Sequence, residues 1–176
     1  MPLEIERRFI VPDPIKVPFD VATEHYQVTQ GYLMYGPNRT LRVGKYVPIK
    51  VSKYGHLPKP YGTLCFKLGV SPVTRHEFEN QITYEEAHEL LKHCVGNIIE
   101  KERYWFKTFT EDEVDPVWEV DVFYGKNQGL ITAEIEIPSE DYKFKIPEFI
   151  GKEVTSDPRY TNASLAKLPY SDWDSI

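Results

Sequence analysis

The sequence predicts a β-rich α+β fold in which eight antiparallel strands close into a barrel, with flanking helices and a further C-terminal helix. Three observations lead to this prediction. Polar and apolar residues alternate with a period of two over most of the chain, which is typical of strands. One face of these segments repeatedly carries charged residues of both signs. The length of 176 residues suits a single domain, which we assign to residues 1–176.

The alternating segments define the strands. We expect them at about residues 3–11, 25–35, 39–47, 62–69, 74–83, 98–109, 117–124 and 130–137. The stretch at 48–61 contains Lys50, Lys53, Lys59 and two tyrosines, and we interpret it as a long basic hairpin loop. Such a loop either lies at a mouth of the barrel and contacts a ligand, or is an ordinary solvated loop.

A helix is expected at about 84–94, between the fifth and sixth strands. Thr83 and Glu86 form a capping-box pattern, which satisfies two backbone N–H groups at a helix start. Gly96 follows the expected end, where glycine is common. The buried stripe of this helix is expected to contain Ala87, Leu90, Leu91 and Cys94.

A last helix is expected to begin at Pro158. Asp157 suits the N-cap position, and proline suits the first helical position because its missing N–H has no partner there in any case. This helix should end before Pro169. The tail beyond it is expected to be loose.

The composition excludes several classes of function. The formal net charge is −6, whereas nucleic-acid binding usually needs a basic surface to neutralise phosphates, so no DNA partner is expected. No stretch approaches the roughly 18 consecutive apolar residues of a membrane span, and the N-terminus is too charged for a signal peptide. We therefore expect a cytoplasmic protein without a membrane partner. Its two cysteines, Cys65 in a strand and Cys94 in a helix, are expected to be buried reduced thiols.

Charge is divided unequally between the two faces of the strands. Successive strand residues point to opposite faces, so Glu4, Glu6 and Arg8 share one face of the first strand. The acids concentrate on the first, seventh and eighth strands, and the bases on the third to sixth. Together the polar faces hold eight acids and seven bases: Glu4, Glu6, Glu77, Glu79, Glu119, Asp121, Glu134, Glu136, Arg8, Arg42, Lys67, Arg75, Lys101, Arg103 and Lys107.

These charged faces have two interpretations. In a sandwich they would be solvated outer surfaces. In a closed barrel they would be enclosed, and because unpaired buried charges are costly, a barrel would hold them for a charged ligand. Carboxylates are hard oxygen ligands for Mg²⁺ or Mn²⁺, and Lys and Arg donate charge-assisted hydrogen bonds to phosphate oxygens. We favour the second interpretation, in which the barrel holds a metal–polyphosphate complex.

The motifs along the chain resemble those of one known family. The opening Glu4-Ile5-Glu6-Arg7-Arg8-Phe9 resembles the ExExK signature of the CYTH superfamily, also called triphosphate tunnel metalloenzymes. The resemblance implies an eight-stranded tunnel with a C-terminal helix near one end, and hydrolysis of triphosphate compounds or, in some members, adenylyl cyclisation. Further motifs follow in family order: Gln30-Gly31-Tyr32-Leu33, Leu41-Arg42, Lys67, Arg75 to Glu79, Glu100-Lys101-Glu102-Arg103-Tyr104, Glu119 to Asp121, Glu134 to Glu136, and Asp157-Pro158-Arg159-Tyr160-Thr161-Asn162.

On this basis we assign roles to individual residues. Lys101 and Tyr32 are the candidate catalytic residues, and Tyr32 would position or deprotonate the attacking water unless it is a plain barrel tyrosine. The metal ligands would be Glu4, Glu6, Asp121, Glu134 and Glu136, with Glu119 in support. The phosphates would be held by Arg8, Arg42, Lys67, Arg75, Lys101 and Arg103.

Two positions depart from the family pattern. Arg8 stands where the family usually has lysine, and its planar, longer side chain is not an equivalent donor. Gly44, in Leu41-Arg42-Val43-Gly44, stands where the family has a second arginine. One phosphate-facing cation is therefore missing, which bears on the phosphate chain that is held.

The expected function is metal-dependent hydrolysis of a triphosphate compound, inorganic triphosphate or a nucleoside triphosphate, with release of orthophosphate and with Mg²⁺ or Mn²⁺ as cofactor. Two alternatives remain open: an adenylyl cyclase that forms cyclic AMP, and a non-catalytic sensor of a triphosphate compound. The expected partner is a small-molecule triphosphate, and the sequence leaves a homodimer open.

Overall fold

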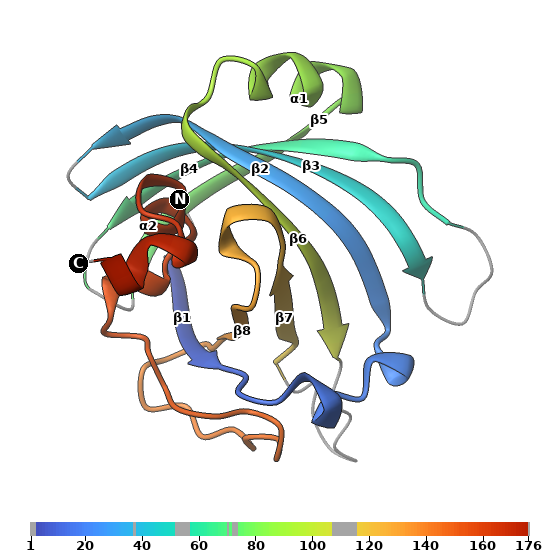
Figure 1. Cartoon of the computed structure of the whole chain (residues 1–176), viewed down its shortest axis with the longest axis vertical. Helices are drawn as coiled ribbons and strands as arrows, with labels where there is room; N and C mark the ends of the chain where they lie inside the picture. The colour runs from blue at the N-terminus through green and yellow to red at the C-terminus, as the bar shows by residue number, and fades with distance from the viewer. Residues whose placement is uncertain are drawn as a thin grey trace.

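The predicted strands are present and form a closed antiparallel barrel in the computed structural model of the chain (Figure 1). The structure describes residues 3–36, 38–51, 57–69, 71, 74–106 and 116–175. Around the barrel the strands follow the order β1-β5-β4-β3-β2-β6-β7-β8, so one face of every strand points into a common interior. The bounds are β1 (Leu3–Ile10), β2 (Glu24–Gly36), β3 (Arg39–Val51), β4 (Tyr61–Gly69), β5 (Thr74–Ile82), β6 (Val95–Phe106), β7 (Trp118–Phe123) and β8 (Ile131–Glu136).

The basic segment predicted as a loop at 48–61 begins and ends as strand. β3 continues to Val51 because β2 pairs with it along its whole length, from Gly36 opposite Arg39 to Glu24 opposite Val51. Tyr61 is already the first residue of β4. Residues 52–56 lie outside the described residues, so contact between this loop and a ligand stays a prediction. Residues 107–109, assigned to the sixth strand, also lie outside them.

The largest hydrophobic core lies outside the barrel, against β1, β7 and β8. The outward-facing Phe9, Trp118 and Ile135 are at most 2% exposed, and Phe144 and Phe149 from the chain after β8 pack against them. The Trp118 ring meets Phe9 and Phe144 edge-on, with ring centroids 5.5 and 5.7 Å apart. In Figure 1 this covering segment is orange. Burial of these aromatic faces stabilises the barrel from outside, which leaves the inner faces free to carry charge.

Helix α1 (Tyr84–Leu91) lies on the outside of the barrel, over β3 and β4. The predicted capping box is present, since the Glu86 N–H donates to Thr83 Oγ1 and the Thr83 N–H donates to the Glu86 carboxylate. The helix lies so close to β4 that a Cβ at Gly62 would be 2.4 Å from the Ala87 Cβ.

The predicted extent of this helix was wrong at its C-terminal end. It ends at Leu91, so Cys94 is in the connection to β6 rather than in a helix. Of the expected buried stripe only Ala87 is buried, while Leu90, Leu91 and Cys94 are half-buried. The cause is that the helix rests on the outside of the barrel, with one side open to solvent.

The predicted C-terminal helix is divided in two. Asp157 caps a 3₁₀ turn at Pro158–Tyr160, and Thr161 then caps a separate helix, α2 (Asn162–Lys167). The tail is not loose, because it forms a 3₁₀ helix over Tyr170–Ser175.

Helix α2 packs against one end of the barrel, as the resemblance implied. Leu165 and Ala166 are fully buried in a cluster with Ile99 of β6 and Phe123 of β7. Its first turn therefore lies next to the inner faces of those strands. None of the helices in the described parts of the chain has the length and apolar character needed to cross a membrane.

Candidate active site inside the barrel

Side chains from all eight strands line one cavity of about 830 Å³ in the barrel interior. The alternation of the sequence predicted that the charged faces of the strands would enclose such a cavity. Lys101 and Asp121 do not line it, and Lys107 lies outside the described residues. Tyr32 does line it. The other twelve charged residues named for those faces all line the cavity: Glu4, Glu6, Glu77, Glu79, Glu119, Glu134, Glu136, Arg8, Arg42, Lys67, Arg75 and Arg103.

One end of the cavity is acidic. A second space of about 370 Å³ opens there, and none of the described residues that line it is basic. It is lined by five glutamates that also line the main cavity. The strand register explains their grouping, because Glu6 lies opposite Glu136 and Glu134 lies opposite Glu119. These residues are Glu4, Glu6, Glu119, Glu134 and Glu136.

Cations from several strands also line the main cavity. Arg42, Lys67 and Arg75 come from β3, β4 and β5. Arg39 and Lys167 line it as well, and neither was predicted from the sequence. Glu77 and Glu79 of β5 lie among these cations. The main cavity therefore mixes both signs of charge, whereas the second space is lined by glutamates.

The charges inside the barrel neutralise one another through ion pairs. Arg8 contacts Glu6 and donates to Glu134 over 2.5 Å. Lys67 lies 3.0 Å from a Glu4 oxygen, and Arg75 lies 3.4 Å from the same oxygen. Such pairing offsets the cost of removing each charge from water. The fold can therefore carry a charged interior, while breaking any one pair leaves an uncompensated charge.

Two of the carboxylates at the acidic end, Glu4 and Glu136, are nevertheless crowded, whereas, against the effect of burial, Arg8 and Arg103 hold the pKa of Glu134 below its usual range. Burial raises the pKa of Glu4 to about 8, and the neighbouring Glu6 and Glu77 contribute in the same direction against Lys67. Burial, Glu77 and Glu6 likewise raise the pKa of Glu136, which makes no ion pair with the described residues. Carboxylates that resist ionisation together gain from a shared divalent cation. The donor set at this end therefore fits a hard metal ion.

Lys101 and Asp121 lie behind the cavity wall. The Lys101 ammonium is fully buried and donates to Asp121 over 2.6 Å and to the Asn162 side-chain oxygen over 3.1 Å. Asp121 also accepts two hydrogen bonds of 2.7 Å from Arg103. Burial and Arg103 lower the pKa of Lys101 to about 8. This geometry suits a support that fixes Arg103, and it places neither Lys101 nor Asp121 on the cavity surface.

Tyr32 reaches the cavity through an irregular part of β2. The pairing register of β2 shifts next to Tyr32, both against β3 and against β6. Such an irregularity changes the direction in which a side chain points. Gly31 is needed beside it, because a Cβ there would lie 2.6 Å from the Cys94 sulfur. Burial raises the pKa of Tyr32 to about 12 against the effect of Arg42, Lys67 and Arg8. The hydroxyl therefore stays protonated at neutral pH and can orient a water but not deprotonate it.

The missing arginine at Gly44 is explained by its surroundings. A Cβ at Gly44 would lie 2.8 Å from the Tyr46 ring and 3.1 Å from Thr63 Oγ1. Tyr46 is held in turn by stacking on Tyr61, with ring centroids 5.0 Å apart and planes 5° from parallel. Tyr46, Tyr61 and Trp105 all line the cavity, so aromatic rings occupy the place of a cation there.

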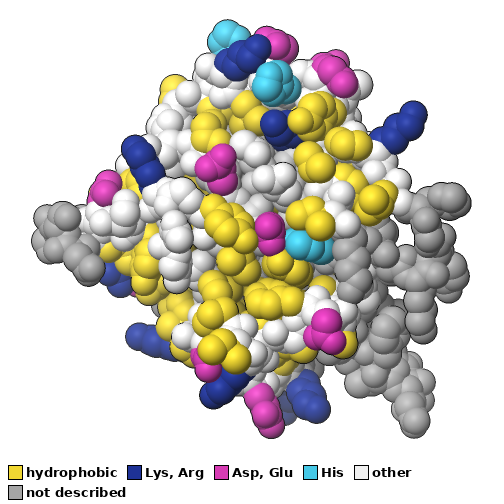
Figure 2. Space-filling view, turned by 45° about the vertical axis from the view of Figure 1, so that its right-hand side comes forward, with side chains coloured by type: hydrophobic (Ala, Val, Ile, Leu, Met, Phe, Trp, Pro, Cys, Tyr) yellow, Lys and Arg dark blue, Asp and Glu magenta, His cyan; other side chains and the backbone are white. Residues whose placement is uncertain are grey.

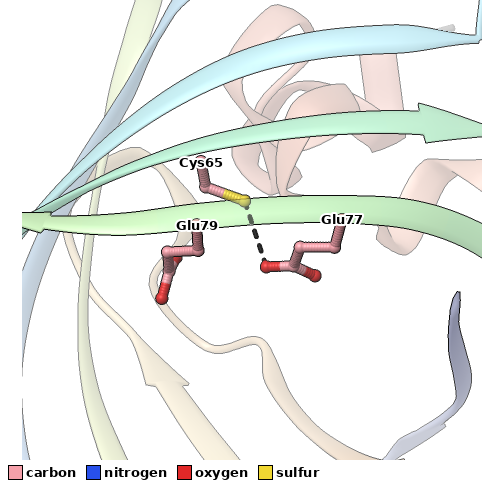
Figure 3. A group of neighbouring side chains, drawn as sticks. All are labelled: Cys65, Glu77 and Glu79. Atoms are coloured by element: carbon pink, nitrogen blue, oxygen red, sulfur yellow. Dashed lines mark hydrogen bonds between the residues drawn. The ribbon is translucent and has the colours of Figure 1, made fainter. Parts of the chain in front are cut away.

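A further group was missed as a potential metal site. Among the described residues, one set of His, Cys, Asp and Glu side chains brings its ligand atoms within 4.8 Å of one another, and it is Cys65, Glu77 and Glu79 (Figure 3). The two glutamates belong to the Arg75–Glu79 motif, in which Arg75 alone was assigned a role from the sequence. The assigned metal ligands do not form such a set, since Arg8 separates Glu6 from Glu134.

Comparison with known proteins finds several inorganic triphosphatases that are similar to this chain. No family model matches the chain. An inorganic triphosphatase of Acetivibrio thermocellus is 36% identical over 173 residues, which cover 97% of each chain. An inorganic triphosphatase of Nitrosomonas europaea is 36% identical over 96 residues, covering 53% of this chain and 61% of its own length. The crystal structure of the inorganic triphosphatase NE1496 aligns with a TM-score of 0.60 at 30% identity, covering 94% of this chain and 95% of that one.

Proposed function

The chain belongs to the CYTH, or triphosphate tunnel metalloenzyme, family, and from this premise we propose that it hydrolyses inorganic triphosphate, or a nucleoside triphosphate, to release orthophosphate. One observation carries the proposal: the interior cavity gathers five glutamates around one opening and holds Lys and Arg side chains from several strands beside them. A metal-bound phosphate chain requires this arrangement, with its cation among hard oxygen ligands and its phosphate oxygens among Lys and Arg donors.

The metal would be held by Glu4, Glu6, Glu134 and Glu136, and either Mg²⁺ or Mn²⁺ fits these oxygen donors. When bound, the ion would neutralise charge on the phosphoryl group and lower the pKa of a water. Asp121 is assigned a different role from that expected from the sequence. It orients Arg103 through two hydrogen bonds rather than coordinating a metal.

The phosphates would be bound by Arg8, Arg42, Lys67, Arg75 and Arg103. Each of these cations is paired with a carboxylate, so phosphate oxygens would take the place of carboxylate oxygens at little net electrostatic cost. Fixed donors that surround developing charge stabilise the transition state of phosphoryl transfer. Lys101 acts through Asp121 and Arg103 as a positioning residue, and Tyr32 orients the attacking water by donating a hydrogen bond.

Phosphate release tests the proposal. The full chain is assayed with inorganic triphosphate, ATP, thiamine triphosphate and a 5′-triphosphorylated RNA, each with Mg²⁺, Mn²⁺ or a chelator. We expect metal-dependent orthophosphate release, with inorganic triphosphate or a nucleoside triphosphate as the best substrate. Cyclic AMP and pyrophosphate from ATP would instead identify a cyclase, and tight binding without turnover would identify a sensor.

We also propose a cytoplasmic location and a homodimer. The location is supported by two free cysteines, which are typical of reducing compartments.

The dimer is supported by a row of outward-facing neighbours on β2 to β5, of which Phe78 is 51% exposed. The row consists of Met34, Leu41, Phe66 and Phe78. Hydrophobic side chains gather in a broad band on the face drawn in Figure 2. Sedimentation velocity of the wild type and Phe78→Glu tests the dimer, and a wild-type monomer at all concentrations contradicts it.

A further inference from the structure

A group of three side chains on the β4–β5 wall differs chemically from the five glutamates. Cys65 lies on β4 directly opposite Glu79 on β5, and Glu77 is the next inward-facing residue along β5. Figure 3 shows the three side chains on the same side of the two strands, with the Cys65 sulfur toward Glu77. The thiol donates to a Glu77 oxygen over 3.1 Å, and the three ligand atoms lie within 4.8 Å of one another.

A buried oxygen without a partner lies on the same wall. Thr63 is two residues before Cys65 on the inner face of β4 and lines the cavity. It is 5% exposed, and its hydroxyl has no hydrogen-bond partner among the described residues. A buried polar atom without a partner is uncommon in a native interior and calls for an explanation such as an ion or a water.

The donor set selects a particular class of metal. Thiolate sulfur is a soft ligand that favours Zn²⁺ and related ions, whereas Mg²⁺ and Mn²⁺ prefer oxygen donors. Zn²⁺ accepts mixed sulfur and carboxylate coordination and leaves room for a water or hydroxyl in the fourth position. Cys65, Glu77 and Glu79 supply one sulfur and two carboxylates.

We propose that Cys65, Glu77 and Glu79 form a second cation site, selective for a thiophilic divalent ion such as Zn²⁺, and that filling this site inhibits the enzyme. As the metal–sulfur bond forms, the thiol proton leaves to solvent, so the thiolate carries the bond. The site adjoins the hard-metal site formed by the glutamates of β1 and β8, because Lys67 contacts both Glu4 and Glu77, but its three ligands are different residues.

The inhibition follows from the ion pairs that the metal would replace. Glu77 lies 2.8 Å from the Lys67 ammonium, and Glu79 lies 2.9 Å from the Arg42 guanidinium. A metal that coordinates both carboxylates takes them from these two cations. Lys67 and Arg42 are proposed phosphate ligands, so their displacement disturbs substrate binding. This consequence rests on the proposed function, whereas metal binding at the site does not.

Cadmium binding tests the site without any assay of activity. Cd²⁺ is titrated into the full chain in excess Mg²⁺, and the ultraviolet thiolate-to-cadmium charge-transfer band is recorded for the wild type, Cys65→Ser and Cys94→Ser. We expect about one cadmium ion per chain in the wild type and in Cys94→Ser, the matched thiol control, and no band in Cys65→Ser. A band that survives in Cys65→Ser, or is absent from the wild type, overturns the proposal.

Glu79→Gln keeps the test decisive if Cys65→Ser does not fold. This variant retains the thiol but loses one carboxylate, so Cd²⁺ affinity should fall about tenfold or more. Unchanged affinity in Glu79→Gln overturns the three-residue site.

Inhibition is measured at buffered free Zn²⁺ with saturating Mg²⁺ and inorganic triphosphate. The wild type and Cys94→Ser should be inhibited, and Cys65→Ser should need about tenfold more free Zn²⁺ for the same inhibition. Equal inhibition of all three proteins overturns the regulatory part. If no triphosphate is hydrolysed at all, the proposed function fails, and cadmium binding alone still decides the site.

Discussion

The two walls of the barrel carry charge on their inner faces but differ on their outer faces. We call β1, β7 and β8 the packed wall, because outward-facing residues such as Trp118 and Ala133 are at most 1% exposed. We call β2 to β5 the open wall, because α1 covers only part of it and Phe78 and Met34 are 51% and 38% exposed. The metal-binding glutamates proposed above lie on the packed wall. Metal coordination needs closely fixed oxygens, whereas long cationic side chains can adjust to a phosphate from a less supported wall.

The largest expected effect comes from removing the support behind the packed wall. Trp118→Ala should lower the free energy of unfolding by about 3–5 kcal/mol, because a fully buried aromatic ring leaves a cavity. Phe78→Ala on the open wall removes a half-exposed ring, and at concentrations where the chain is monomeric it should change the free energy of unfolding by less than about 0.5 kcal/mol. Urea denaturation of both variants measures the difference. Similar losses of unfolding free energy in the two variants would show that the two walls are equally supported, and the contrast between them would be wrong.

Neutralising a glutamate of the packed wall should act on activity. Glu136→Gln should reduce kcat about a hundredfold or more, because a hard cation loses an anionic ligand. Its Tm should stay the same or rise, since Glu136 makes no ion pair with the described residues and its pKa is raised by burial and by nearby carboxylates. Kinetics with inorganic triphosphate and thermal denaturation measure both quantities.

Glu6→Gln serves as the matched variant. It should lose turnover to a similar degree but have a lower Tm, because Arg8 loses one of its two carboxylate partners. Near-wild-type turnover in both glutamine variants would refute the metal-site assignment, and equal Tm values would refute the distinction between the paired and unpaired glutamate.

Introducing the family arginine at Gly44 of the open wall should destabilise the fold. Gly44→Arg is expected to lower the free energy of unfolding by about 1–3 kcal/mol, because the new side chain overpacks the space beside Tyr46. The double variant Gly44→Arg with Tyr46→Ala should be less destabilised than the sum of the two single variants, since alanine provides room. Urea denaturation of the wild type, the two single variants and the double variant gives the four free energies of this double-mutant cycle. Additive effects would mean that Tyr46 is not the obstacle.

The sequence predicts which face a residue occupies better than how deep it lies. Period-two alternation identified the inward-facing Glu4, Glu6, Lys67 and Arg75 correctly, because side-chain direction in a strand is fixed by backbone geometry. The alternation could not show that the Lys101 ammonium is buried away from the cavity. This burial depends on Asn162, which lies 61 positions further along the chain and accepts a hydrogen bond from Lys101. Contacts over such a distance are set by the tertiary fold.

Residues at the ends of elements escaped prediction for a related reason. Arg39 begins β3 directly after a turn with Asn38 at a φ of 57°, and Lys167 is the last residue of α2. In the strand predicted at 39–47, the alternation gave Arg39 the outward face, opposite to that of Arg42, and Lys167 lies in no strand. The aromatic wall at Tyr46 and Tyr61 was likewise hidden, because the absence of an arginine at Gly44 does not reveal what fills the space.

The smallest expected effect concerns the segment that covers the packed wall. Arg7 on β1 pairs with Glu153 of that segment through two hydrogen bonds, and the hydrogen bond from Arg7 holds the pKa of Glu153 below its usual range. A carboxyl group whose pKa is lower in the folded than in the unfolded state stabilises the fold above its unfolded pKa, and this stabilisation is lost as the pH falls through the folded pKa. Both side chains are about one-third exposed, so Glu153→Gln should cost only about 0.5 kcal/mol at neutral pH. Thermal denaturation of the wild type and Glu153→Gln from pH 7 to the acidic range should show a small difference in Tm that disappears on acidification. A difference that persists or grows at low pH would mean that the side chain acts through packing and not through its charge. The covering segment would then be held by the apolar contacts of Phe144 and Phe149 and by its backbone hydrogen bonds to β1.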